Sequence, residues 1–503
     1  MRAWPALAGC AVAAAWFLAS SPAAQTQQPA TEQIRIDANA PGRPFPHFWE
    51  KMFGSGRAIL SLREDYRRDL RAVKEVTGFQ YIRFHDILDD DVGLYAVNGQ
   101  GRPVYNFSYV DEIYDGLLAN GVRPFVELSF MPGALAISQK PHAFWYKPLP
   151  NPPKDYGRWG ELVYALTEHL VDRYGLDEVA QWYFEVWNEP NIDFWTGEPK
   201  QSTYFELYDS AARAIKRVNA RLRVGGPATA QAAWIPEFIR HSVDRRVPVD
   251  FVSTHVYGND RAEDIFGTHE QIPRSDMVAR AVKKVFEQVK ASPRPGLPVF
   301  WTEYNASYMN EIPVTDSPFM GPWLANNIRQ CDGQTSMMSY WSFSDVFDEQ
   351  GVVKTPFYGG FGLIAVDDIP KPAFAAFELL HKLGDQRIAL DSDSALLTRR
   401  KDGSLVMAVW NYAPPDRPGT SQVVNLQFKD TKASHASIWR VDPAHGDVHA
   451  AYEKMGSPRY PSRTQVEQLR KAAALAPPET RTLKNGALSI ELPTYGLAVI
   501  EVR

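Results

Sequence analysis

The chain has 503 residues, of which 45% are hydrophobic and 22% charged, and it can therefore build a large core and more than one domain. This composition excludes a protein that is disordered over most of its length. The formal net charge is −5, and Lys and Arg are spread along the sequence without blocks of like charge. We therefore expect no nucleic-acid partner and no anionic membrane surface as partner.

The N-terminus has the order of a secretory signal. The charged start Met1-Arg2 is followed by an apolar stretch over residues 6–19 and by small residues at 20–24. This apolar stretch is shorter than the roughly 20 residues that a membrane span requires. We predict that residues 1–24 are a signal peptide and that the protein is exported to the periplasm or the medium. Residues 25–40 are expected to form a linker and a strand that joins the C-terminal domain.

Removal of this segment would leave Cys331 as the one remaining cysteine, so no intramolecular disulfide could form. A single cysteine where an apolar stretch turns polar is typical of a small buried residue.

Residues 41–384 alternate short apolar runs with longer helical patterns. Helical segments are expected at 63–76, 109–120, 156–174 and 202–218, and in the third of these the apolar residues recur at helical spacing. Strand followed by helix, repeated eight times, predicts a parallel (β/α)8 TIM barrel. The eight apolar runs are 47–54, 80–84, 122–129, 181–187, 222–226, 249–255, 297–302 and 335–341.

Residues 385–503 have a different pattern, in which short strands alternate with turns such as Asp402-Gly403 and Asn485-Gly486. We predict an antiparallel β-sandwich domain with one helical patch at 464–473. The expected strands are 395–399, 405–412, 422–428, 436–441, 487–492 and 497–502.

In a barrel of this type, reactive groups project from the carboxyl ends of the strands. The fourth run ends in Asn188-Glu189-Pro190, and Pro190 cannot donate to the strand ladder, so the strand is expected to stop where Glu189 emerges. In the seventh run, Glu303 follows four strand-forming residues. Two carboxyl groups at one barrel mouth could flank a glycosidic bond, one protonated and one ionised. We predict Glu189 and Glu303 as the catalytic pair.

Further polar and aromatic residues end other runs. His255 and Tyr257 lie on one side of the sixth run by its two-residue repeat and could orient Glu303 or hold a sugar hydroxyl. Asn188 could donate to a substrate 2-hydroxyl. His85 and Trp341 end the second and eighth runs, and Phe130 follows the third; the tryptophan is a natural floor for a sugar ring.

At these residues the sequence resembles the members of glycoside hydrolase family 39, the group that includes bacterial β-xylosidases and α-L-iduronidase. The resemblance implies Glu189 as acid/base and Glu303 as nucleophile, with His85, Phe130, Asn188, His255, Tyr257 and Trp341 around the sugar. It also implies a barrel with a β-sandwich and no cofactor. The motifs that carry it are His47-Phe48-Trp49-Glu50, Gly54-Ser55-Gly56-Arg57-Ala58, Tyr81-Ile82-Arg83-Phe84-His85, Trp187-Asn188-Glu189-Pro190, Thr302-Glu303-Tyr304-Asn305 and Tyr340-Trp341-Ser342-Phe343-Ser344-Asp345.

The chain departs from the family pattern after the eighth run. Xylosidase-like members tend to carry paired Glu there, whereas this chain has Asp348-Glu349. We expect both residues to contact substrate. Asp348 is one methylene shorter, so a hydroxyl contact could be lost, lengthened or bridged by water. This departure weakens the argument for xylose.

We therefore expect a retaining glycoside hydrolase that acts on an oligosaccharide or polysaccharide, in the manner of an exo-acting β-xylosidase. The alternatives are an endo-acting hydrolase of the same clan and a non-catalytic carbohydrate-binding protein. The sequence has no His-Glu-x-x-His motif and no cysteine pair, so we expect no metal site. The sequence is also compatible with a homo-oligomer.

Overall fold

The computed structural model describes residues 30–503. The predicted signal peptide, 1–24, and the first part of the predicted linker lie outside the described residues. Within 30–503, none of the helices is both long enough and apolar enough to cross a bilayer.

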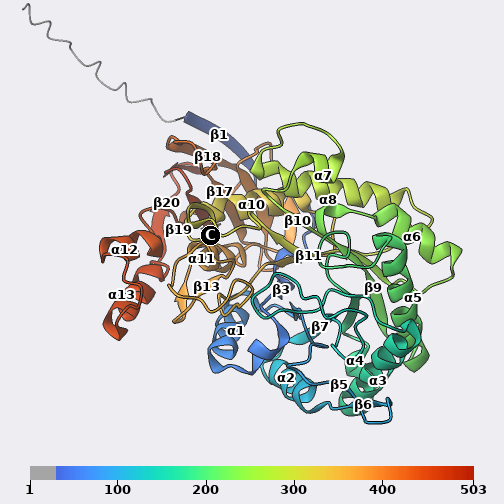
Figure 1. Cartoon of the computed structure of the whole chain (residues 1–503). Helices are drawn as coiled ribbons and strands as arrows, with labels where there is room; N and C mark the ends of the chain where they lie inside the picture. Colours follow the sequence, from blue (N-terminus) through green and yellow to red (C-terminus); the bar gives the residue numbers. More distant parts are fainter. Residues whose placement is uncertain (1–29) are drawn as a thin grey trace, which may run out of the picture.

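Eight parallel strands close into a barrel with the order β10-β11-β12-β3-β4-β7-β8-β9. Each strand overlaps one of the eight predicted runs, so the expected (β/α)8 barrel is confirmed (Figure 1). The first run differs in detail, because residues Phe48–Glu50 form the 3-10 helix η1 and the strand begins afterwards. The barrel strands are β3 (Met52–Gly54), β4 (Tyr81–Phe84), β7 (Arg123–Leu128), β8 (Tyr183–Val186), β9 (Arg223–Thr229), β10 (Phe251–Tyr257), β11 (Val299–Asn305) and β12 (Met337–Tyr340).

The helices that follow these strands present one apolar face each to the barrel. In α3 (Tyr156–Tyr174), the side chain of Asp155 accepts hydrogen bonds from the backbone N–H groups of Gly157 and Arg158 and so caps the helix. Its predicted apolar face is buried, including Trp159 and Leu166. The other large barrel helices are α1 (Glu64–Thr77), α2 (Ser108–Ala119), α5 (Lys200–Val218), α6 (Ile235–Asp244), α8 (Arg274–Lys290), α10 (Met320–Cys331) and α11 (Pro372–Leu380). Cys331, at the end of α10, is a buried free thiol whose pKa is raised by burial.

Shorter elements fill the connections. They are η2 (Ala58–Leu62), β5 (Tyr95–Val97), β6 (Pro103–Tyr105), α4 (Leu176–Val179), η3 (Ala230–Ala232), α7 (Ala262–Phe266), α9 (Ile312–Thr315), β13 (Ile364–Ala365) and β14 (Ile369–Pro370).

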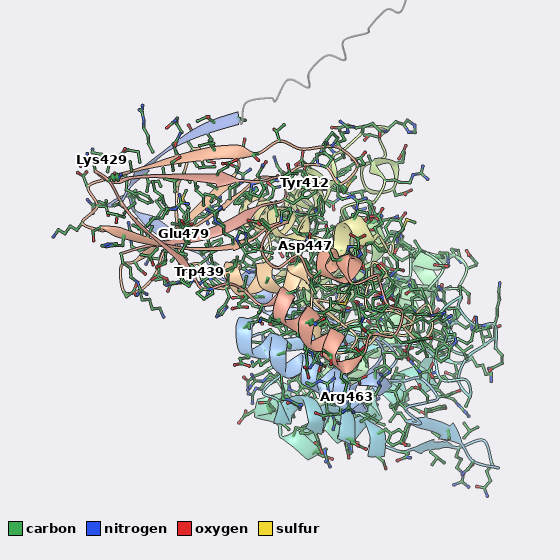
Figure 2. All side chains as sticks on the ribbon, turned by 90° about the vertical axis from the view of Figure 1, so that its left-hand side faces the viewer. Tyr412, Lys429, Trp439, Asp447, Arg463 and Glu479 are labelled. Atoms are coloured by element: carbon green, nitrogen blue, oxygen red, sulfur yellow. The ribbon has the colours of Figure 1, made fainter. Side chains whose placement is uncertain are left out.

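Two sheets lie beside the barrel. The larger has seven antiparallel strands in the order β2-β15-β16-β17-β22-β19-β20, and the smaller has the order β1-β18-β21. Figure 2 shows these strands extending away from the barrel, with Lys429 at their far end. Their bounds are β1 (Ala30–Asp37), β2 (Gly42–Pro44), β15 (Gln386–Ile388), β16 (Ala395–Arg399), β17 (Leu405–Trp410), β18 (Gln422–Lys429), β19 (His435–Val441), β20 (Glu479–Thr482), β21 (Ala487–Leu492) and β22 (Leu497–Val502).

These sheets differ from the expected pattern in four ways. The short strands β15 and β20 are not among the six predicted strands. The strand β1 pairs with β18 in parallel, so the smaller sheet is mixed (Figure 1). Residues 42–44, at the start of the predicted barrel range, form β2 and pair with β15. The helical patch at 464–473 is present as α13 (Arg463–Ala473), and a second helix, α12 (Val448–Lys454), precedes it.

The larger sheet belongs to two apolar cores. In β17, Val406 and Ala408 pack into the core that continues through the barrel. Met407 and Val409, on the opposite face, pack into a second core that also contains Ile36 of β1. Since side chains alternate along a strand, one sheet contacts the barrel helices with one face and the smaller sheet with the other.

Candidate active site

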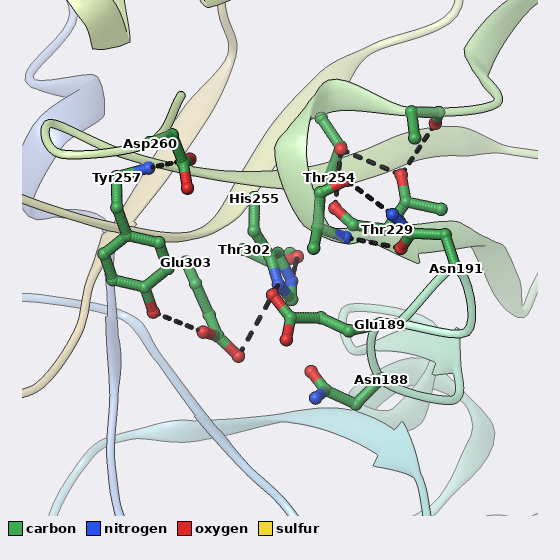
Figure 3. A network of polar contacts seen from close by, with 12 residues as sticks. Asn188, Glu189, Asn191, Thr229, Thr254, His255, Tyr257, Asp260, Thr302 and Glu303 are labelled. Atoms are coloured by element: carbon green, nitrogen blue, oxygen red, sulfur yellow. Dashed lines mark hydrogen bonds and ion pairs between the residues drawn. The ribbon is translucent and has the colours of Figure 1, made fainter. Parts of the chain in front are cut away.

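Glu189 and Glu303 meet at the carboxyl ends of the barrel strands. Glu189 follows β8, and Glu303 lies near the end of β11. Figure 3 shows both side chains beside His255 of β10, and one ligand atom from each of the three residues lies within 4.8 Å of the others. The two carboxyl groups that the sequence places 114 positions apart, at 189 and 303, are therefore close neighbours.

The loop that carries Glu189 is tightly held. Trp187 and Glu189 have positive φ angles of 74° and 44°. Residues other than glycine rarely adopt such angles, and here they turn the chain sharply after β8. The Glu189 backbone N–H donates to the carbonyl of Ala228 at 2.7 Å. The Asn191 amide accepts from the backbone N–H of Ala230 at 2.8 Å and donates to its carbonyl at 3.0 Å. The loops after β8 and β9 thus fix the position of the Glu189 carboxyl group.

Both carboxylate oxygens of Glu303 accept hydrogen bonds. Arg83 of β4 donates to Oε1 at 2.8 Å, and the Tyr257 hydroxyl donates to Oε2 at 2.6 Å. The tyrosine stays protonated, because burial and the neighbouring carboxyl groups raise its pKa well above the ordinary value. A guanidinium and a phenol on one carboxylate stabilise its negative charge.

Glu189 is in the opposite electrostatic situation. Burial raises the pKa of Glu189 well above its ordinary value, and the charges of Glu303 and Asp260 raise it further. No guanidinium forms an ion pair with it among the described residues. The two carboxyl groups therefore differ as an acid and a nucleophile must.

His255 connects Glu189 to a chain of hydrogen bonds inside the barrel. Its Nδ1 lies 3.0 Å from Glu189 Oε1, and its Nε2 lies 3.0 Å from the hydroxyl of Thr302. That hydroxyl donates to Glu185 at 2.8 Å. Burial, and then the positive charge of Arg83, hold the pKa of His255 well below the ordinary value, so the ring is neutral.

The direction of this chain fixes the proton positions. Glu185 forms an ion pair with Arg83 at 2.6 Å, so its oxygens act as acceptors and Thr302 must donate to it. The Thr302 oxygen can then only accept from His255 Nε2–H, which leaves Nδ1 of the neutral ring without a proton. An unprotonated Nδ1 beside Glu189 Oε1 requires the proton of this contact to reside on Glu189.

Arg83 holds the acidic residues of the site in place. Its buried guanidinium also donates to Asn188 at 2.9 Å and pairs with Glu127 at 2.8 Å. Arg83, Glu127 and Glu185 are site residues that the sequence-based assignment omitted. A signal was present, because Glu127 and Glu185 interrupt apolar runs, where an unpaired charge is very unfavourable.

A cavity of about 370 Å³ opens above the two carboxyl groups. Seven of the predicted site residues line it: His85, Asn188, Glu189, Tyr257, Glu303, Trp341 and Glu349. Gln231, Asp260, Tyr308 and Phe361 also line it and were not predicted.

Comparison with known proteins matches residues 32–486 to the family described as glycosyl hydrolases family 39. The chain belongs to this family. A β-xylosidase from Geobacillus stearothermophilus is 40% identical over 473 residues, which are 91% of this chain and 93% of that protein. The predicted family and the predicted glycoside hydrolase activity are both confirmed.

Solved structures agree with this assignment. A monomeric β-xylosidase from Caulobacter crescentus CB15 superposes with a TM-score of 0.85 at 34% identity, covering 94% of this chain and 99% of that one. A family 39 enzyme from Xanthomonas axonopodis pv. citri gives a TM-score of 0.86 at 32% identity, covering 96% and 99%.

Two predicted contact residues of this family 39 enzyme lie behind the cavity wall. Phe130 is fully buried and packs against His85 and Trp187, with ring centroids 5.9 and 5.3 Å away. His255 is also fully buried and acts through Glu189. Neither is among the lining residues; Phe130 packs against the lining residue His85, and His255 lies within hydrogen-bond distance of the lining residue Glu189.

Asp348 and Glu349, which follow the last barrel strand of the family 39 enzyme, point in different directions. Glu349 lines the cavity and its Oε1 lies 3.8 Å from His85 Nε2. Asp348 does not line it, and its carboxylate lies 3.9 Å from the guanidinium of Arg57. The direct substrate contact expected for Asp348 is therefore not supported by its position.

The Trp341 ring, the expected floor of the sugar site, depends on a glycine. A Cβ atom on Gly54 would lie 2.1 Å from the Trp341 ring, too close for any side chain at that position. The ring also packs against His85, with centroids 4.9 Å apart. Gly54 of β3 therefore lets Trp341 lie flat against the end of the barrel.

Proposed function

We propose that Glu303 attacks the anomeric carbon of a β-xyloside-like substrate while Glu189 protonates the leaving oxygen. One observation carries this proposal: the two carboxyl oxygens lie within 4.8 Å, one beside Arg83 and Tyr257, the other buried with a raised pKa. Retaining glycosidases separate these groups by about 5–5.5 Å, and inverting enzymes by about 6.5–9.5 Å to admit a water. The spacing favours retention.

Each step follows from the groups present. In the first step, Glu303 forms a bond to the anomeric carbon, the glycosidic bond breaks, and the departing oxygen takes the proton of Glu189. Glu303 loses its charge in this ester, so the pKa of Glu189 falls at the moment when it must act as a base. In the second step, Glu189 removes a proton from water, the water oxygen bonds to the anomeric carbon, and Glu303 leaves.

The proposed substrate is a short oligosaccharide with a terminal β-xylose. Two β-xylosidases, 40% and 37% identical to this chain, support this choice. A cavity of about 370 Å³ favours removal of a terminal sugar over cutting inside a long chain.

An endo-acting enzyme is the second candidate, and one observation favours it. A larger cavity of about 1090 Å³, lined by Tyr358, Tyr412 and Arg417, shares Asp260 with the catalytic cavity. A longer chain could extend from one cavity into the other. Product analysis with a defined xylo-oligosaccharide separates the two: xylose from the first time point indicates exo action, and internal fragments indicate endo action.

Two substitutions test the assigned roles. Glu303→Gln should abolish covalent labelling by a fluorinated glycoside, measured as the mass shift of the intact protein. Glu189→Ala should lose activity on substrates with poor leaving groups by roughly 10²–10⁴-fold but keep it on substrates with activated leaving groups. As a control, Glu270→Gln changes an exposed glutamate paired with Arg280 and should behave like the parent. Parent-like hydrolysis of natural substrate by both catalytic variants would refute the assignment.

We also propose the domain division and the export that the sequence suggests. The catalytic barrel spans 41–384, except that residues 42–44 pair with the β-sandwich at 385–503, and cleavage occurs near residue 24. The shared apolar core of the two sheets supports a sandwich. N-terminal sequencing of the protein from the periplasm or medium tests cleavage. Light scattering measures the oligomeric state, which the sequence leaves open; the similar Caulobacter β-xylosidase is described as monomeric.

A further inference from the structure

A second cluster of ionisable groups lies at the other end of the barrel. His47 and Glu50 precede β3, whereas the catalytic carboxyl groups emerge at the carboxyl ends of the strands. His381 follows α11, 331 positions after Glu50 in the sequence. One nitrogen from each histidine and one carboxylate oxygen lie within 4.8 Å of one another.

Both imidazoles face the same carboxylate oxygen. His47 Nδ1 lies 2.5 Å and His381 Nδ1 lies 2.9 Å from Oε1 of Glu50. The second oxygen, Oε2, is buried and has no hydrogen-bond partner among the described residues. Two nitrogens and a carboxylate that converge in this way are the donor set of many zinc sites.

The other nitrogen of His47 provides an independent indication. Its Nε2 lies 3.4 Å from the carbonyl of Gly384, and stacking of the ring on Trp49, with centroids 4.4 Å apart, fixes its orientation. In this orientation Nε2 faces the Gly384 carbonyl, and Nδ1 faces the point where Glu50 and His381 converge. With a metal at Nδ1, the proton of the neutral ring resides on Nε2, and donation from that nitrogen to a backbone carbonyl is usual for metal-bound histidine.

We propose that His47, Glu50 and His381 bind one divalent transition-metal ion of the zinc type. The side chain of His381 is 46% exposed, so the ion can enter from solvent and complete its coordination with water. The bound ion links the segment that enters the barrel to the segment that leaves α11 toward the C-terminal sheets. The ion would bind at the end of the barrel opposite Glu189 and Glu303, so it is separate from the hydrolytic site.

The test uses the full chain after treatment with EDTA and dialysis. Calorimetric titration with ZnCl2 should show one ion per chain, and Zn²⁺ should raise the thermal unfolding midpoint. The first equivalent should leave hydrolysis unchanged. Co²⁺ should give visible absorption bands in the same protein, which reports ligation without any substitution.

Matched variants locate the ion. His381→Gln and Glu50→Gln should weaken Zn²⁺ binding at least tenfold and remove the thermal shift. His269→Gln should bind like the parent, because His269 contacts a single carboxylate, that of Glu263 at 2.9 Å, without a second histidine. Absence of binding by the parent overturns the proposal, as does equal binding by parent and His381→Gln. Inhibition by the first equivalent also overturns it, since that result would place the ion on Glu189 and Glu303.

Discussion

At the scale of single residues, the different proton states proposed for Glu189 and Glu303 depend on neighbours that do not line the cavity. His255 is fully buried, and its tautomer follows from the hydroxyl of Thr302, which in turn follows from the ion pair of Glu185 with Arg83. The raised pKa of Glu189 is thus supported by a specific hydrogen-bond direction as well as by burial.

Thr302→Val should shift the pH dependence of this enzyme. Valine removes the acceptor for His255 Nε2–H, so the ring should change to the Nδ1–H tautomer and donate to the Glu189 carboxylate. That bond stabilises the charged form of Glu189 and lowers its pKa. Activity falls as Glu189 loses its proton, so the basic limb of the kcat/KM profile should move to lower pH. We expect a shift of roughly one to two pH units, because a hydrogen bond to a charged group is worth about 1.5–3 kcal/mol and one pKa unit corresponds to about 1.4 kcal/mol.

Thr302→Ser is the matched control, because it keeps the hydroxyl at the same position. Its profile should superpose on that of the parent. If the valine and serine variants have the same basic limb, the hydrogen-bond chain does not set the proton position.

At the scale of elements, the segment between β12 and α11 completes the active site. It carries Trp341, Glu349 and Phe361, all of which line the cavity. Its anchor is the buried ammonium of Lys371, which donates to Asp316 at 2.7 Å and to Asp345 at 2.9 Å. A third donation goes to the carbonyl of Gly360 at 2.7 Å.

Lys371→Met should destabilise the protein and weaken substrate binding. The substitution leaves the two aspartates buried without their cation, which costs about 3–5 kcal/mol for a pair of this kind. Burial of a protonated carboxyl group costs less free energy than burial of a carboxylate. The loss of stability should therefore be smaller in acid than at neutral pH. Denaturant unfolding and KM measure the two effects. Lys401→Met, at a 91% exposed side chain, is the control and should change neither; an unaltered KM in Lys371→Met would show that the segment is held by other contacts.

The elements also show what the sequence could predict. Barrel strands that are buried on both faces begin with consecutive apolar residues, as at Val299, Phe300 and Trp301 of β11, and a local sequence pattern therefore indicates them. β2 and β15 are three-residue strands of mixed polarity whose partners lie far away in the chain, so no local pattern indicates them. The same limit applies to Arg83, whose partners come from three other strands and one loop, and to the cluster of His47 and His381.

At the scale of the whole molecule, the barrel and the two sheets share structural elements. The alternating side chains of β17 and β22 pack into both apolar cores: Val406 and Val499 contribute to the barrel side, and Met407 and Ile500 to the side of the smaller sheet. Loss of the smaller sheet would expose the second face of these strands to water. The barrel and the sheets are therefore expected to unfold together.

Ile36→Ala tests this coupling far from the active site. Ile36 of β1 is 1% exposed and packs in the core between the two sheets, so its truncation should cost roughly 2–5 kcal/mol of stability. Its neighbour Arg35 is exposed on the opposite face of the strand, and Arg35→Ala should leave stability nearly unchanged. Calorimetry and residual activity after heating should report one common transition, shifted to lower temperature in Ile36→Ala, with kcat unaltered well below that transition. Activity that instead survives a first transition in which only the sheets unfold would contradict this expectation. In that case β17 and β22 do not couple the two cores, and the barrel is stable without the sheets.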